Sequence, residues 1–196
     1  MKRGILTIML YLCILLVYAK PHYFERDKDL LTPDFFQTQF AGNIGFVSAG
    51  FGKIHSKNRF SSALIIGYVP KFIGNATIVQ ITQKNTFRAS NFSYKKLENI
   101  YPYIGGAISI ETGRNSFLKL PSHYPEGYYT TNAISFPVLM GLTYQGKLHN
   151  NMRIKQTEYY AEIGTMVSYI YYNIIQKKYF NPNILSLALG IRIILI

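Results

Sequence analysis

The last fourteen residues, Asn183 to Ile196, read NILSLALGIRIILI and alternate for most of their length between two kinds of side chain. Six large apolar residues fall on one parity: Leu185, Leu187, Leu189, Ile191, Ile193 and Leu195. The other parity carries Ser186, Ala188, Gly190 and Arg192. Successive side chains of a β-strand point to opposite faces, so this stretch predicts a strand with one apolar face and one small or polar face. Such a strand is typical of a β-barrel whose outer face contacts lipid and whose inner face lines a narrow lumen.

The front of the chain predicts a secretion signal that is cleaved after residue 19. Lys2 and Arg3 form its basic start, an almost wholly apolar run follows, and Ala19 is the small residue at the expected cleavage point. The apolar run is about 15 residues long, whereas a membrane-spanning helix needs roughly 20. We therefore expect a signal peptide at residues 1–19, a periplasmic lead-in at 20–34 and an outer-membrane β-barrel at 35–196.

Composition limits the chemistry that the mature chain can perform. Its one cysteine, Cys13, falls inside the expected signal, which leaves no thiol for disulfides, nucleophilic catalysis or metal binding. The net charge of +12 falls to +10 when Lys2 and Arg3 are removed with the signal. The remaining basic residues form no basic helix and no RNA-binding motif, so we expect no nucleic-acid partner.

Two features of the composition favour a membrane surface instead. Basic residues at strand ends and turns are suited to anionic headgroups, including the phosphates of lipopolysaccharide. The chain also has 17 tyrosines and no tryptophan, and a tyrosine ring is well placed at the level of the headgroups. The expected partners are therefore outer-membrane lipid, lipopolysaccharide and the assembly machinery that inserts barrels into the membrane.

The alternating pattern recurs along the chain and predicts eight strands. They cover residues 35–42, 44–55, 60–69, 77–88, 103–112, 132–145, 157–171 and 183–196. An even number is usual for bacterial single-chain barrels, so the expected fold class is all-β, an eight-stranded antiparallel transmembrane β-barrel in up-and-down order. Residues 35–42 could also continue into 44–55 as one long strand, which would leave seven. A soluble β-sandwich or lipocalin-like barrel would place its apolar residues inside, and the small and polar inner faces argue against it.

The connections between these strands alternate in kind. Those at residues 56–59, 91–99 and 147–155 are expected on the periplasmic side, together with the chain termini. Those at 70–75, 113–129 and 174–182 are expected outside. The loop at 113–129 is rich in proline, glycine and tyrosine, so we expect it to be extracellular and ordered by its own aromatic packing.

Four short segments carry a resemblance to a known protein family. They are Gln39–Phe46 (QFAGNIGF), Gly67–Lys71 (GYVPK), Leu120–Pro121 and Tyr124–Tyr129 (YPEGYY). In this order and spacing they resemble a family of outer-membrane β-barrel proteins of uncharacterised function from Bacteroidota-type bacteria. The resemblance extends over nearly all of the mature chain. It implies an outer-membrane barrel, and it supplies no catalytic residue and no cofactor.

His55 and Ser56 form the sharpest enzymatic candidate. Lipid A deacylases, which are small barrels, use a histidine, a serine and an acidic residue, with the histidine and serine close in sequence. Here the serine directly follows the histidine, so on a strand the two side chains would point to opposite faces. A serine nucleophile needs its base within hydrogen-bond reach. A lipid-acting enzyme is therefore kept as the alternative to a solvated turn.

A second candidate cluster is Ser122, His123 and Glu126, in the long loop. Its surroundings favour a packed structural loop or a ligand-contacting loop over a catalytic site. The four histidines are scattered without the spacing of metal ligands, so we expect no metal site and no cofactor.

The expected lumen contains a structural cluster of charges. A hairpin register centred on Lys177 places Glu162 opposite Arg192 on the inner face, with Glu158 or Glu111 as other carboxylates that could pair with the arginine. An inward charge in a narrow barrel is costly unless it is paired. The interior of an eight-stranded barrel is just wide enough to be filled by its own side chains, so we expect no open pore. The expected function is therefore a structural or interaction role in the outer membrane, without catalysis.

Overall fold

The computed structural model describes residues 32–55, 59–74, 76–89, 99–113, 116–117, 133–146, 154–175 and 184–195. The strands are β1 (Phe35–Ala41), β2 (Val47–His55), β3 (Phe60–Val69), β4 (Ile78–Arg88), β5 (Ile100–Gly113), β6 (Ile134–Ser135), β7 (Pro137–Gly146), β8 (Ile154–Met166) and β9 (Ser186–Leu195). Two helices, α2 (Lys71–Gly74) and α3 (Val167–Ile175), lie between strands.

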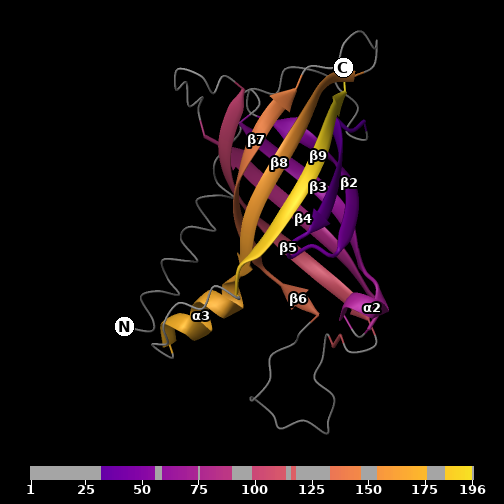
Figure 1. The fold of residues 1–196 in the computed structure, drawn as a ribbon, viewed down its shortest axis with the longest axis vertical. Helices are drawn as coiled ribbons and strands as arrows, with labels where there is room; N and C mark the ends of the chain where they lie inside the picture. Colours follow the sequence, from indigo (N-terminus) through magenta and orange to yellow (C-terminus); the bar gives the residue numbers. More distant parts are fainter. Residues whose placement is uncertain are drawn as a thin grey trace, which may run out of the picture. The chain divides into compact units, whose positions relative to one another are not determined.

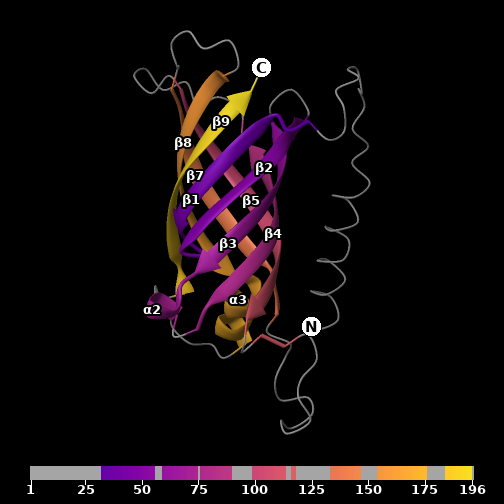
Figure 2. The same cartoon turned by 90° about the vertical axis from the view of Figure 1, so that its right-hand side faces the viewer.

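The strands close into a barrel in which each is antiparallel to its neighbours (Figures 1 and 2). The sheet order is β4-β3-β2-β1-β9-β8-β7-β5-β6, and an additional β4–β5 pairing joins its ends. The short β6 and the longer β7 are one position in the wall, because both pair with β5 in the same register: Ser135 with Ser109 and Val138 with Gly106. The fold is thus the expected eight-stranded antiparallel barrel in meander order. β1 and β2 pair with each other as separate strands, which excludes the seven-strand alternative.

The outer face of the barrel is apolar on every long strand. Leu189 of β9 is 54% exposed and Met140 of β7 is 64% exposed. Other exposed residues of the wall include Phe36, Phe40, Phe51, Leu64, Ile66, Ile81, Phe87, Ile104, Ile108, Ile110, Leu142, Tyr144, Tyr159, Ile163, Leu187 and Ile191. These positions follow the two-residue alternation of the sequence, so the predicted inward and outward faces are confirmed for most of the wall.

The inner face is small, polar and charged. Its buried polar residues include Gln37, Gln39, Gln80, Thr82, Lys84, Ser109, Glu158, Glu162 and Arg192. Glycines make room for large rings among them: a Cβ at Gly190 would collide with the ring of Tyr160, and one at Gly141 would lie 2.6 Å from the ring of Tyr103. Glycine in a strand is suited to such close packing in a narrow barrel.

The strand directions place the connections alternately at the two ends of the barrel. Phe35, the first residue of β1, pairs with Gly52 near the end of β2 and with Ile194 near the end of β9. Both helices lie at the opposite end (Figure 1). Asp34, which was expected in the lead-in, already belongs to the barrel wall: its N–H donates to the carbonyl of Gly52, and its carboxylate accepts from the N–H of Ile54 at 2.9 Å.

The prediction of one strand over residues 157–171 is wrong in its second half. β8 ends at Met166, and residues 167–171 lie in α3. The neighbouring strand β7 begins at Pro137, which pairs with Met166, and after one more backbone hydrogen bond, from the N–H of Val167 to the carbonyl of Phe136, the chain turns into the helix. Ser168 is exposed on the helix, and Thr165 is buried near the end of β8, so the two-residue alternation expected for a single long strand does not continue here.

Candidate functional site

The strongest concentration of polar chemistry lies in the barrel lumen, and β4 supplies much of it. Gln80, Thr82, Lys84 and Thr86 are all buried on its inner face, and Arg88 is half-buried at its end. Alternate residues of one strand share a face, which brings these five side chains into the lumen in a row.

Lys84 and Glu162 form a buried ion pair near the middle of the lumen. The Nζ of Lys84 lies 2.6 Å from the Oε2 of Glu162, and the two residues are 2% and 5% exposed. The hydroxyl of Tyr103 donates to the same oxygen at 2.8 Å. The carboxylate is thus held by one cation and one hydroxyl, which offsets the cost of removing it from water.

Gln39 joins this pair to a second tyrosine. The Nζ of Lys84 donates to the Oε1 of Gln39 at 3.3 Å, and the hydroxyl of Tyr160 donates to the same atom at 3.2 Å. The ammonium also lies 5.1 Å from the centroid of the Tyr160 ring, within the range of a cation–π contact. We call the set Gln39, Lys84, Tyr103, Tyr160 and Glu162 the central network.

A second cluster, which we call the terminal cluster, is built around Glu158. Its Oε1 accepts from Arg88 at 2.7 Å and from the Nε2 of Gln145 at 3.0 Å. An Nη of Arg192 lies 3.6 Å from its other oxygen, and Arg192 also donates to Gln37 at 3.3 Å. Both arginines therefore share one carboxylate.

The register expected for the last hairpin is wrong. Arg192 lies opposite Glu158, and Glu162 lies opposite Ala188. Glu158, which the sequence offered as an alternative partner, is the carboxylate beside Arg192, and Glu162 instead binds Lys84. Glu111 belongs to neither cluster, because it accepts from Ser116 at 2.8 Å and from Gln80 at 3.4 Å.

Sequence reasoning missed the cations of β4 and the role of Tyr103, whereas the alternation along residues 157–171 did place Tyr160 on the inner face. Lys84 and Arg88 were counted among basic residues at strand ends and turns, although Lys84 lies within its strand. The signal that could have identified Lys84 and Arg88 is the parity of residues 80, 82, 84, 86 and 88, which are all polar. On a strand, this run marks one continuous polar face.

Two small cavities lie between these lumenal side chains in the part of the chain that the structure describes. Each has a volume of about 10 Å³. One lies beside Arg59, Arg88 and Arg192, and the other lies beside Asn43 and Glu162. A volume of this size is about that needed for one water molecule.

The enzymatic candidates are placed only in part. His55 is exposed at the end of β2, with its ring 5.9 Å from that of Phe60. Ser56, Ser122, His123 and Glu126, like most of the 113–129 loop, lie outside the described residues. Within the described residues there is no group of three or more side chains suited to holding a metal ion. No helix in that part of the chain is long and apolar enough to cross a membrane.

Comparison of the chain with protein-family models, with curated proteins and with solved structures found no match.

Proposed function

We propose that this protein is an outer-membrane β-barrel with a structural or interaction role. The observation that supports it is the inversion of polarity across the wall: large apolar side chains are exposed outside, and ion pairs are buried inside. In water, an apolar surface that runs around the whole barrel would be an aggregation hazard. In a bilayer the same surface is solvated by lipid, and a closed barrel leaves no unpaired strand edge in the hydrocarbon.

Aromatic residues at the helix-bearing end also favour a membrane surface. Phe72 of α2 is largely exposed, and its ring meets that of Phe46 edge-on at 6.5 Å. Tyr169 and Tyr171 of α3 are exposed as well. Aromatic side chains are enriched where hydrocarbon meets the headgroups. Together with the basic charge of the chain, they support lipid and lipopolysaccharide as partners.

A groove on the outer wall is of the right kind to hold part of a lipid chain. It crosses β8, β9, β1, β2 and β3, has a volume of about 810 Å³, and is lined by Thr38, Ala49, Ile66, Tyr68 and Leu189 among others. The small side chains of Thr38 and Ala49 lie directly opposite each other in the wall, between larger apolar neighbours. This shape adds support to lipid contact at the outer face.

Tryptophan fluorescence tests the membrane proposal, because the chain has no tryptophan of its own. After reconstitution into vesicles that contain brominated lipid, Met140→Trp should be quenched strongly, since the side chain at this position points outward from the wall of β7. Lys155→Trp is the matched control, because Lys155 is also exposed but lies near the end of β8. We expect it to be quenched much less. Equal and negligible quenching at both positions would contradict insertion.

No observation among the described residues favours a lipid-acting enzyme. His55 is the only histidine of the proposed candidates that the structure describes, and its ring stacks beside Phe60 at a strand end. Mass spectrometry of lipid A from cells with and without the gene is the direct measurement. Unchanged lipid A is the expected result, and a loss of acyl chains that depends on His55 would overturn it.

A further inference from the structure

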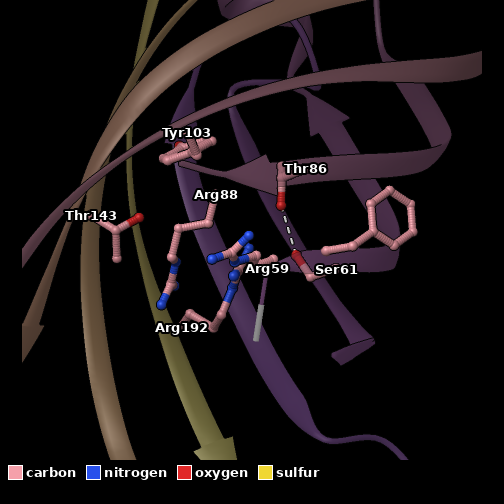
Figure 3. A pocket seen from close by; sticks show the side chains of 8 residues that line it. Arg59, Ser61, Thr86, Arg88, Tyr103, Thr143 and Arg192 are labelled. Carbon is pink, nitrogen blue, oxygen red and sulfur yellow. Dashed lines mark hydrogen bonds between the residues drawn. The ribbon is translucent and has the colours of Figure 1, made fainter. Parts of the chain in front are cut away.

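Three arginines converge at one end of the lumen. Arg59, Arg88 and Arg192 line a cavity of about 10 Å³, together with Ser61, Thr86, Tyr103 and Thr143 (Figure 3). Figure 3 shows the guanidinium groups of Arg59, Arg88 and Arg192 turned toward one another, although they come from different strands or turns. Like charges repel one another at close range, so such a cluster is stabilised by negative charge nearby.

Among the described residues, the negative charge in contact with these arginines comes from Glu158. Glu158 contacts both Arg88 and Arg192, whereas the side chain of Arg59 makes no hydrogen bond or ion pair among the described residues. Within the described ranges, three arginines thus line this cavity and one carboxylate, that of Glu158, contacts two of them. Positive charge is concentrated around the cavity.

A buried donor at the same place has no partner. Arg192 is 9% exposed, and its Nε–H makes no hydrogen bond. The Nη groups of Arg192 are directed to Gln37 and Glu158, so the Nε–H is the donor that remains. Buried polar groups in proteins are almost always satisfied by a protein group, a water or an ion.

We propose that this cavity is an anion-binding site. One anionic acceptor atom enters the cavity, takes the Nε–H of Arg192, and is closed in from the exposed side by the guanidinium of Arg59. The cavity holds one atom of about the size of a water oxygen, which fits a halide or one oxygen of a phosphate whose other oxygens project toward Arg59. Arginine is the side chain best suited to such oxyanions. The proposal does not depend on membrane insertion.

The test measures thermal unfolding of the whole barrel in a zwitterionic detergent while sodium phosphate is added at constant ionic strength. We expect phosphate to raise the unfolding temperature of the parent protein, because a ligand that binds only the folded state stabilises it. Arg59→Gln should weaken the apparent affinity by about tenfold or more, since it removes a charge-assisted donor. Its exposed side chain has no other partner among the described residues, so the barrel itself should still fold.

Lys155→Gln is the matched control. It removes the same charge from an exposed position of β8 that does not line the cavity. We expect it to keep the full response to phosphate. Equal responses of the parent protein and Arg59→Gln, or equal losses in both variants, would overturn the proposal by showing either no site or only general screening of charge.

Two further titrations identify the source of the anion. Sodium chloride in place of phosphate should reproduce the response if a halide suffices. Phosphatidic acid added to the detergent should act at far lower concentration than inorganic phosphate if a lipid headgroup is the ligand. A response to any of the three that Arg59→Gln removes supports the site, and a response to none of them rejects it.

Discussion

Replacing Lys84 by methionine should lower the free energy of unfolding by about 3–5 kcal/mol, because it leaves the carboxylate of Glu162 buried without its cation. The pair is 2.6 Å apart and almost fully buried, so water cannot take the place of the ammonium. The hydroxyl of Tyr103 alone would remain as a donor to the same oxygen. Urea unfolding of the reconstituted barrel, followed by circular dichroism, measures the effect.

A double-mutant cycle separates the pair from its surroundings. Adding Glu162→Gln to Lys84→Met removes both charges, so we expect a coupling energy of about 2–3 kcal/mol between the two positions. Glu162→Gln should show no comparable coupling with Arg192→Met, because Arg192 lies beside Glu158. The register expected from the sequence had instead paired Glu162 with Arg192. A strong coupling between positions 162 and 192 would contradict the described register.

Lys71→Met is the matched control for the loss of one positive charge. Lys71 is exposed in α2, where a substitution away from specific contacts changes stability by about 0.5 kcal/mol or less. Equal, small changes in the free energy of unfolding for Lys71→Met and Lys84→Met would contradict a stabilising ion pair between Lys84 and Glu162 in the central network.

The direction of each side chain, outward or into the lumen, could be predicted for most of the wall because side chains alternate with a period of two along a strand. Along β9, Leu187, Leu189 and Ile191 are exposed while Ala188 and Arg192 are buried, as the alternation in the sequence indicates. This information is local and needs no knowledge of the partner strand. The same local pattern predicted a strand over residues 77–88, more polar than the others, and the structure has β4 at Ile78–Arg88.

The pairing of the last two strands could not be predicted in the same way. The expected register placed Glu162 opposite Arg192, whereas Glu158, four positions earlier in the chain, occupies that place. A shift by an even number of residues keeps every side chain on its predicted face and changes only its partners. The alternation of the sequence therefore cannot distinguish the two registers.

The prediction of one strand over residues 157–171 was also wrong, in the segment that connects β8 to β9. Residues 167–175 form α3, and a period-two pattern of tyrosines at 159, 169 and 171 had suggested one longer strand. β8 stops where its neighbour β7 starts at Pro137. Partner strands are distant in sequence, so the end of a strand is decided by pairing that the local pattern does not contain.

The central network depends on contacts across the lumen, which the sequence does not encode as a spacing. Lys84 and Glu162 are 78 positions apart, and Gln39 is 45 positions from Lys84. Parity placed each of them inside. Only the closure of β4 onto β5 decides which of the inward groups meet.

Placing arginine at Leu189 should destabilise the barrel in a bilayer by about 2–4 kcal/mol if this residue faces the hydrocarbon near the midplane. Leu189 is 54% exposed and lies near the middle of β9. On the outer surface of a soluble barrel, the same change would meet only water and cost almost nothing. Urea unfolding of the protein in vesicles therefore tests the proposed location as well as the orientation of the side chain.

Arginine at Leu185 is the control that tests whether the cost of the charge depends on its depth in the bilayer. Leu185 is also exposed, but it precedes the first residue of β9 and so lies at the end of the wall. Arginine there should cost only about 0–1 kcal/mol, because a charge near the interface can reach water and headgroups. A lipid-facing wall predicts a large difference between the two arginine variants, and a wall exposed to water predicts none. Equally small losses of stability in Leu185→Arg and Leu189→Arg would contradict the proposal that the outer face of the wall contacts lipid.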